Sequence, residues 1–201
     1  MKEEGKREYR LEQRAERQAA TRRRIIEAVV ALHEEVGPAR TTVVEIAERA
    51  RVSRPTVYSH FPDDGSLIRA CSRHWSLANP RPDPTAWKSI ADPQTRLRDG
   101  LEQLYAYYSP RERMLSNVFR DAALIPSLFE AIQHTVVPYS ESAAKILATG
   151  WKTRSRDRRK LLAVLRLALD FHTWQTLTRH GGLTNEEAAG LMAGLVAKGV
   201  V

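Results

Sequence analysis

Residues 52–61 read VSRPTVYSHF and place a proline inside a segment that otherwise has the composition of a short helix. If Ser53 is the N-cap, Arg54 and Pro55 lie in the first turn of that helix. Backbone N–H groups in a first turn have no intrahelical partner, so a proline there breaks no hydrogen bond. The stretch therefore predicts a short helix that begins after Ser53 and tolerates its proline.

One face of this predicted helix is apolar and the other is polar. At about 100° per residue, Val57 and Phe61 share a face that would pack against an apolar face containing Ile46 and Ala50. The outward side chains are Arg54, Pro55, Thr56, Tyr58, Ser59 and His60. Such a face suits a DNA major groove, because arginine can read guanine, proline can contact a thymine methyl, and hydroxyl or imidazole groups can hold phosphates. The alternative is a solvated surface helix in a bundle.

The neighbouring segments also predict short helices. An apolar stripe beginning at Ile25 indicates a helix that Gly37 terminates. Thr42 and Glu45 have the spacing of a capping box, which predicts a second helix start. A fourth helix is expected over 63–75. Three helices with a tight turn between the second and third are the components of a helix-turn-helix.

Composition limits the class of protein without locating a site. The chain has 201 residues and a formal net charge of +8, which favours an anionic partner but is spread along the sequence. It contains no apolar run of about 20 residues and no apolar secretory segment at the N-terminus. The single cysteine, Cys71, is expected to be buried and inert. These features predict a cytoplasmic protein without a membrane partner.

The run from Ile25 to Leu67 resembles the DNA-binding domain of tetracycline-repressor (TetR) family regulators. The resemblance rests on about 45 residues, and segments of the C-terminal half look like the regulatory domain of that family. It implies a homodimer that binds double-stranded DNA at a near-palindromic operator and releases it when a small-molecule effector binds. By this resemblance Thr42 would contact a backbone phosphate. The expected DNA-binding residues are Thr42, Arg51, Ser53, Arg54, Pro55, Thr56, Tyr58, Ser59 and His60.

By the same resemblance, the predicted helix that begins after Ser53 is the recognition helix, which enters the DNA groove. The sequence departs from the family pattern on both sides of this helix. The family usually has glycine in the turn where this chain has Arg51, and a left-handed arginine costs roughly 1 kcal/mol. A phosphate contact by Arg51 would offset that cost. The family also commonly has a lysine just after the phenylalanine, where this chain has Asp63 and Asp64. We expect one of these aspartates to cap the fourth helix, leaving phosphate binding to Arg51 or to the cluster Arg22-Arg23-Arg24.

The remaining sequence predicts further helices and no strand, so the fold class is all-α. We expect an N-terminal arm over 1–20, flexible or helical, and a helix-turn-helix domain with its connecting helix over 21–76. A proline-rich linker is expected over 77–94, and a helical regulatory and dimerisation domain over 95–201. Asp92 and Ser109, each before a proline, are expected to cap helices. Two more helices are predicted over 126–149, with Pro138 as a possible break, and over 157–180.

The C-terminal half has no motif for catalysis. It contains no HExxH, GxSxG or glycine-rich phosphate loop, so no catalytic residue, metal site or cofactor is expected. Aromatic residues with a few polar groups suggest a small-ligand cavity, although aromatic residues at helical spacing are more often core. The expected ligand-binding residues are Tyr105, Tyr108, Phe119, Arg120, Phe129, Phe171, His172 and Trp174.

A last helix is predicted to start at the capping box formed by Thr184 and Glu187. This helix and the one over 157–180 have apolar stripes wide enough for a partner as well as the monomer core. By resemblance they form the dimer surface, with small residues such as Gly190 and Gly194 allowing close helix approach. The sequence predicts a transcriptional repressor and not an enzyme. The alternatives are an activator or ligand-independent regulator of the same fold or, from another class, a helical small-molecule-binding protein or enzyme.

Overall fold

The computed structural model describes the backbone of residues 2–200 and the side chains of 9–154 and 157–198. In that part of the chain every regular element is helical, which confirms the all-α class. The chain divides into two compact units, Met1–Asn79 with Ser116–Ala131, and Pro80–Leu115 with Ile132–Val201. None of the described helices is long and apolar enough to cross a bilayer.

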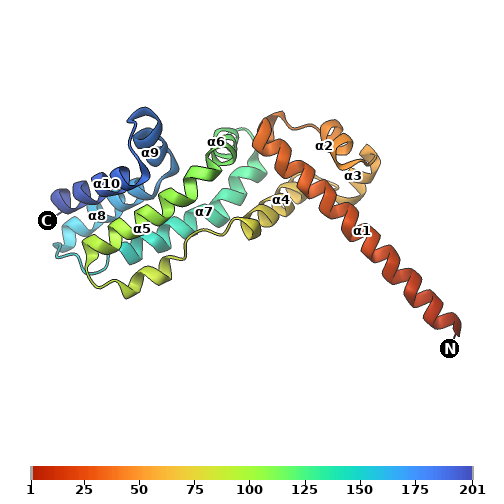
Figure 1. The fold of residues 1–201 in the computed structure, drawn as a ribbon, viewed down its shortest axis with the longest axis horizontal. Helices are drawn as coiled ribbons and strands as arrows, with labels where there is room; N and C mark the ends of the chain where they lie inside the picture. Colours follow the sequence, from red (N-terminus) through yellow and green to blue (C-terminus); the bar gives the residue numbers. More distant parts are fainter. Residues whose placement is uncertain (1, 201) are drawn as a thin grey trace. The chain divides into compact units, whose positions relative to one another are not determined.

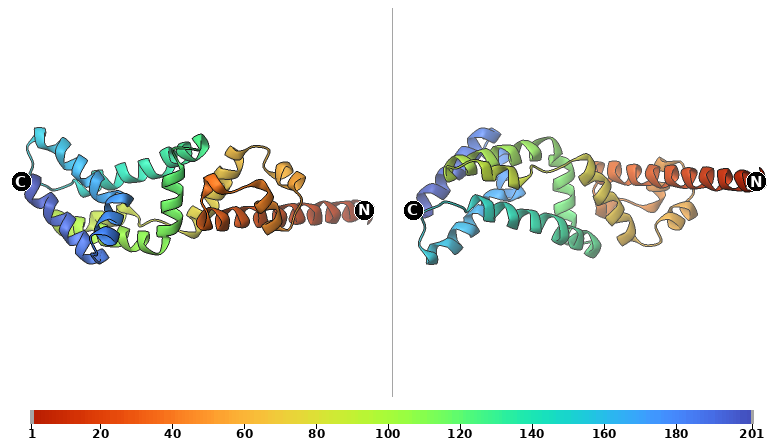
Figure 2. Two further views of the ribbon diagram at one scale, coloured as in Figure 1. Left: turned by 90° about the horizontal axis from the view of Figure 1, so that it is seen from above. Right: turned by 90° about the horizontal axis from the view of Figure 1, so that it is seen from below.

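The first unit is built around a long N-terminal helix. Its elements are α1 (Lys2–Glu35), the 3-10 turn η1 (Pro38–Arg40), α2 (Val43–Ala50), α3 (Arg54–His60) and α4 (Asp64–Ala78). The end of α6 (Glu112–Asp121) and the start of α7 (Pro126–Leu147) also belong to this unit. Helices α2, α3 and α4 gather around the C-terminal half of α1, and its N-terminal half runs out beyond them (Figures 1 and 2).

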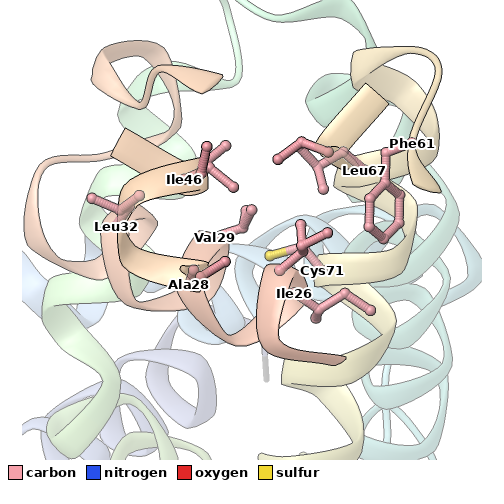
Figure 3. Packing of buried hydrophobic residues seen from close by; sticks show 12 residues of the cluster. Ile26, Ala28, Val29, Leu32, Ile46, Phe61, Leu67 and Cys71 are labelled. Atoms are coloured by element: carbon pink, nitrogen blue, oxygen red, sulfur yellow. The ribbon is translucent and has the colours of Figure 1, made fainter. Parts of the chain in front are cut away.

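The core of the first unit is made by the apolar faces of α1, α2, α3 and α4. Val29 is fully buried, and Ile46, Val57 and Phe61 are almost so. Figure 3 shows Ala28, Val29 and Leu32 from α1 facing the same interior as Ile46, Phe61, Leu67 and Cys71. The predicted packing of α3 on the Ile46 and Ala50 face of α2 is therefore confirmed, and the buried state of Cys71 is as expected.

The second unit contains the remaining helices. These are η2 (Pro84–Ser89), α5 (Pro93–Tyr108), the 3-10 turn η3 (Ser109–Arg111), α8 (Ser155–Leu169), α9 (Phe171–Gln175), a π-helical turn η4 (Thr176–His180) and α10 (Asn185–Val200). Helix α10 packs against both α5 and α8. Arg96 is buried and donates to the carbonyl oxygens of Ile90, Ala91 and Thr149, which fixes the start of α5 to the end of η2 and to the turn after α7.

Three local predictions for this half need revision. The single helix expected over 157–180 is wrong, because α8 ends before Asp170, whose carboxylate caps α9 by accepting from the N–H groups of His172 and Thr173. Pro138 lies inside the continuous helix α7 and does not break it. Asp92 caps α5 as expected, but Ser109 is itself helical and makes no cap hydrogen bond, so the chain continues through η3 into α6.

The structure also groups two segments differently from the sequence. The proline-rich segment 77–94 contains folded elements: α4 continues to Ala78, and Trp87 of η2 is 1% exposed and donates from Nε1 to Gln103 Oε1 at 3.1 Å. Residues 116–131, which the sequence assigns to the C-terminal domain, belong to the same compact unit as the N-terminal helices.

Candidate nucleic-acid interface

Helix α3 is fixed at both ends by short-range hydrogen bonds. Ser53 is the N-cap, and its Oγ accepts from the N–H of Thr56 at 3.3 Å. Pro55 is in the first turn, where its missing N–H leaves no helix hydrogen bond unmade. Phe61 closes the helix by donating its N–H to the carbonyl oxygen of Val57 at 2.9 Å. The start of α3 and its tolerance of proline are therefore as the sequence predicts.

The residues expected to contact DNA lie on the outer side of α2 and α3. Seven of the nine are exposed, and the side chains of Thr56 and His60 are half-buried. Tyr58 is 54% exposed although it is a large aromatic residue. Because Val57 and Phe61 are held in the core, the register of α3 is set and the opposite side must face outward. The structure thus brings these nine residues together on one small motif.

The hydroxyl groups on α3 already make internal hydrogen bonds. The Oγ of Ser53 and the Oγ1 of Thr56 share a hydrogen bond of 2.8 Å, and the Ser59 hydroxyl donates to the Thr56 carbonyl oxygen at 2.8 Å. Among the described residues, Arg54 and Tyr58 make no such bond and keep their side-chain donors available. We therefore expect these two to carry most of the direct contacts to DNA.

Thr42 is engaged in the predicted capping box of α2. Its hydroxyl donates to Glu45 Oε2 at 2.7 Å, and its backbone N–H donates to the same oxygen at 2.9 Å. These hydrogen bonds, the side-chain one first, lower the pKa of the Glu45 carboxyl from its ordinary value. A phosphate contact through the Thr42 hydroxyl would require that proton to turn away from Glu45.

Arg51 occupies the left-handed position at the end of α2. Its φ is 54° and its ψ is 50°, and it has the sole positive φ among the described non-glycine residues. The turn is closed by the N–H of Val52, which donates to the Ala47 carbonyl oxygen at 2.9 Å. The turn geometry is therefore the one that glycine favours, and the arginine side chain is held exposed beside the start of α3.

The two aspartates after Phe61 belong to the start of α4. Asp63 is the N-cap and accepts from the N–H of Ser66 at 2.6 Å, whereas Asp64 is the first helical residue and is exposed. Negative charge at a helix N-terminus is stabilising. The expectation that one of them caps this helix is confirmed, and the capping residue is Asp63.

The arginine cluster 22–24 does not act as one patch. The Arg22 guanidinium lies 4.6 Å from the centroid of the Phe61 ring, Arg23 pairs with Glu27 at 3.8 Å, and Arg24 contacts the Thr21 hydroxyl at 3.4 Å. The three side chains thus have separate neighbours on different sides of α1. Arg22 supports the end of α3 through a cation–π contact.

The eight residues expected to bind a ligand fall into two groups. Tyr105, Tyr108, Phe171, His172 and Trp174 lie in the second unit, whereas Phe119, Arg120 and Phe129 lie in the first. In the group of three, Arg120 makes an ion pair with its buried neighbour Asp121 at 2.7 Å, and Phe129 is 51% exposed. The sequence therefore combined two sets of residues that the fold assigns to different units.

The five residues of the second unit form an aromatic cluster with one exposed member. The rings of Tyr108, Phe171 and Trp174 lie 5.4–5.7 Å apart between centroids, and His172 is exposed. The Tyr105 hydroxyl donates to the Ala168 carbonyl oxygen and the Tyr108 hydroxyl to that of Leu169, both at 2.8 Å. Phe171 and Trp174 are almost fully buried, so they are part of the core of this unit.

Tyr107 is not singled out by the sequence pattern, but unlike Tyr105 and Tyr108 its hydroxyl donates no hydrogen bond within the described residues. Its side chain is buried and its oxygen has no hydrogen-bond partner of good geometry among the described residues. Burial raises the pKa of this hydroxyl, and the nearby guanidinium groups of Arg81 and Arg111 act in the opposite direction. An arginine can only donate, so neither of them offers an acceptor for the hydroxyl proton. Buried donors almost always have an acceptor. A bound molecule with a hydrogen-bond acceptor would satisfy this hydroxyl.

A second group missed at the sequence level joins α6 to the end of α1. Asn117 is buried and donates to the carbonyl oxygens of His33 and Glu34, and Asp121 accepts from the N–H of Ala39 at 2.9 Å. Gly37 has φ 96° and leaves no room for a side chain, because a Cβ would clash with Arg120 and Asp121. These bonds fix the segment that leads into the helix-turn-helix.

Comparison with known proteins agrees with this geometry. Residues 25–71 match the family model for bacterial regulatory proteins of the tetR family. The chain is 28% identical over 137 residues to YvkB of Bacillus subtilis (strain 168), an uncharacterized HTH-type transcriptional regulator, and this match covers 66% of the chain and 67% of YvkB.

Solved structures show the same fold over most of the chain. A TetR-like transcriptional regulator from Rhodococcus sp. RHA1 superposes with a TM-score of 0.62 at 19% identity, covering 89% of this chain and 94% of that one. PfmR of Thermus thermophilus, a TetR family transcriptional regulator, superposes with a TM-score of 0.61 at 18% identity, covering 87% and 97%.

The fold and the exposed face of α3 define a helix-turn-helix DNA-binding protein, and the relatives indicate a regulator and not an enzyme. Residues 25–71 carry the DNA-binding domain described by the family model for bacterial regulatory proteins of the tetR family.

Proposed function

We propose that this protein is a homodimeric cytoplasmic repressor that binds a near-palindromic operator through α3 and leaves it when a small molecule binds the second unit. The observation that carries the proposal is the construction of α3. Val57 and Phe61 anchor one side of the helix in the core, and the other side presents Arg54, Pro55 and Tyr58 to solvent.

Each exposed residue of α3 has a distinct task in this proposal. Arg54, with a free guanidinium, would donate two hydrogen bonds to a guanine edge, and Pro55 would contact a thymine methyl. Tyr58 and Arg51 would bind phosphate oxygens on either side and set the register of the helix in the groove. Arg54 would therefore supply sequence preference, and Arg51 would supply affinity that depends on salt.

The apolar surface of α8 and α10 supports dimerisation. Leu167 of α8 and Leu191 and Leu195 of α10 are each 45–56% exposed. A Cβ added at Gly190 or Gly194 would meet no atom within 4 Å, so α10 is open to another helix on this side. Leucines that are half exposed beside small residues suit a helix–helix interface between two copies. The two recognition helices would then bind successive major grooves, about 34–36 Å apart.

The aromatic cluster of the second unit supports an effector site beside Tyr107. An effector that carries a hydrogen-bond acceptor would satisfy the Tyr107 hydroxyl and pack on the Tyr108 ring, which lies 5.8 Å away between centroids. An apolar body with one acceptor is the general chemistry of such sites. Binding would favour a dimer whose recognition helices no longer match the operator.

The experiment begins with genomic fragments selected by the purified protein, from which a short operator duplex is defined. Binding of the wild type, Arg54→Ala and Arg73→Ala is then measured on this operator and on a duplex of random sequence. Arg73 is an exposed arginine on α4 and serves as the control. We expect Arg54→Ala to lose operator preference by about tenfold or more and Arg73→Ala to keep it. Equal weakening of Arg54→Ala on both duplexes would refute a base-reading role.

Dimerisation and release are tested separately. The double variant Leu191→Glu/Leu195→Glu is expected to sediment as a monomer and to lose operator binding, while Leu77→Glu on α4, also an exposed leucine, is expected to do neither. A small-molecule library is then screened for compounds that release the selected operator. A monomeric wild type that still binds the palindrome would contradict the dimer.

A further inference from the structure

The N-terminal half of α1 lies beyond the core of its unit. The helix begins at Lys2, and among its side chains from residue 9 onward the first buried one is Ile25. We call residues 2–24 the α1 extension. At 1.5 Å per residue it is about 34 Å long. Figures 1 and 2 show its N-terminal part running out beyond α2, α3 and α4, whereas Arg22 near its C-terminal end contacts the Phe61 ring.

The charged residues of the α1 extension lie on separate sides. Arg10, Arg14 and Arg17 are spaced by four and three residues and therefore form one stripe, whereas Glu12 and Glu16 form another on a different side. All five side chains are exposed. Within the described residues, none of the three arginines pairs with a carboxylate, so the positive stripe is not neutralised by that part of the chain.

The arginine stripe continues the buried face of α1. Arg10 and Arg14 lie 18 residues before Ala28 and Leu32 respectively, which is five full turns of an α-helix. Ala28 and Leu32 are buried and face the core that α2 and α4 complete. The arginines therefore point from the extension towards the side on which the helix-turn-helix is built, and the glutamates do not.

The composition of the extension excludes an apolar partner. Tyr9 and Leu11 are its large apolar side chains in the described part, both about 60% exposed, and no stripe of them repeats. A coiled coil or a membrane surface needs a continuous bulky apolar face. Residues 9–24 contain six arginines and two glutamates, so the complementary partner is a polyanion. An isolated charged helix of this length is marginal in water, and neutralising its arginines on a partner would stabilise it.

We propose that the α1 extension is a second DNA-binding element, in which Arg10, Arg14 and Arg17 bind phosphates of the duplex flanking the operator. The inference rests on the proposed function, because α3 must first dock on the operator. An element about 34 Å long spans about one turn of duplex, or about 10 bp. Each subunit would thus extend the contact by about one turn outside its half-site.

The test compares operator duplexes that carry either 2 bp or 12 bp of flanking DNA on each side. Binding is measured over a salt series for wild type, for Arg10→Gln/Arg14→Gln/Arg17→Gln and for the control Glu12→Gln/Glu16→Gln. Long flanks should strengthen wild-type binding at least tenfold and steepen its salt dependence, by about 2–3 in slope per subunit for three phosphates. The arginine variant should lose both effects and equal wild type on short flanks. The glutamate variant should keep both.

Hydrogen exchange provides an independent readout. Amides of residues 9–21 should exchange rapidly in the free protein, become protected on the long duplex, and stay unprotected in the arginine variant. All substituted side chains are exposed, and equal thermal unfolding of the three proteins will show that folding is unchanged.

The outcomes separate the two proposals. If wild type shows no preference for the selected operator over random DNA, the proposed function fails. If it prefers the operator but binds short and long flanks equally, the function stands and the extension does not bind DNA. A glutamate variant that loses flank dependence as the arginine variant does would also overturn the inference, and would point to pairing of the extension with another protein segment.

Discussion

The side-chain amide of Asn117 donates to the backbone carbonyl oxygen of His33 at 3.0 Å, and its second bond reaches Glu34 at 2.9 Å. These carbonyls lie in the last turn of α1, where carbonyl groups have no intrahelical donor. Asn117 thus caps α1 from a helix that lies more than 80 residues away in sequence. The bond joins α6 to the helix that carries the core of the DNA-binding unit.

We predict that Asn117→Ala lowers the free energy of unfolding by about 1–3 kcal/mol, because a buried and a partly buried carbonyl group lose their donor. The control is Gln18→Ala, which removes an exposed amide from α1 itself and should change stability by less than about 0.5 kcal/mol. Urea denaturation measures both. Equal stability of Asn117→Ala and wild type would mean that water replaces the amide at no cost.

Arg51→Gly should separate stability from DNA affinity. Glycine relieves the left-handed strain at φ 54°, so we expect unfolding to cost up to about 1 kcal/mol more than in wild type. The same change removes a cation beside α3, so operator binding should weaken and its salt dependence should flatten by about 1 in slope per subunit. Thermal unfolding and a salt series of binding measure the two effects.

Arg51→Asn is the companion variant, because asparagine tolerates the left-handed region and carries no charge. It should reproduce the loss of affinity with a smaller gain in stability. If both variants bind the operator as tightly as wild type, Arg51 has no phosphate contact, and its presence in the turn is unexplained by DNA binding.

Short-range features of this chain were predictable and long-range ones were not. The Thr42–Glu45 capping box and the Ser53 cap depend on residues three apart, and their spacing is visible in the sequence. The bonds of Asn117 join segments more than 80 residues apart, and no local pattern encodes them. For this reason the sequence places residues 116–131 with the C-terminal helices, whereas the fold groups them with the N-terminal ones.

The residues predicted to bind a ligand fall into two units for a related physical reason. Aromatic residues at helical spacing indicate a buried face but not which helix it faces, so Phe119 and Phe129 could not be separated from Phe171 by pattern alone. The hydroxyl of Tyr107 lacks an acceptor because of what surrounds it, and only the fold reveals that. In contrast, the break between α8 and α9 has a local signal, because Asp170 is an N-cap residue type inside an apolar run.

Tyr105→Phe and Tyr107→Phe form a matched pair of stability tests. The first removes a buried hydrogen bond of 2.8 Å to the Ala168 carbonyl oxygen, and should destabilise the protein by about 1–2 kcal/mol. The second removes a buried hydroxyl without a partner among the described residues, and should be neutral or slightly stabilising. Urea denaturation of both variants measures the difference.

The same pair tests the proposed effector site. With a compound that releases the operator, Tyr107→Phe should need at least a tenfold higher concentration for release, because the effector loses its hydrogen-bond donor. Tyr105→Phe should respond as wild type does, since its hydroxyl is occupied inside the fold. A normal response of Tyr107→Phe would move the effector site away from this hydroxyl.

We predict that His33 makes the stability of the first unit sensitive to acid. Burial lowers its pKa from 6.5 to about 4, although the Asp121 carboxylate acts in the opposite direction, and its Nδ1 lies 3.7 Å from the buried Cys71 Sγ. Between about pH 6.5 and pH 4 the unfolded chain binds a proton at this residue and the folded chain does not. Stability should therefore be complete above pH 6.5 and fall by about 3 kcal/mol as pH drops towards 4.

The control is His33→Gln, which cannot titrate in this range. Its stability at neutral pH is expected to be lower, because a buried polar side chain is exchanged for one of another shape, so the quantity compared is the pH slope and not the absolute value. Urea midpoints taken every half pH unit from 7.5 to 4.5 should fall steeply in wild type and weakly in the variant. Carboxyl groups such as Asp121, whose pKa is lowered first by its hydrogen bond from Arg120, titrate below this window and cannot produce the difference. Parallel slopes in the two proteins would show that His33 is protonated in the folded state.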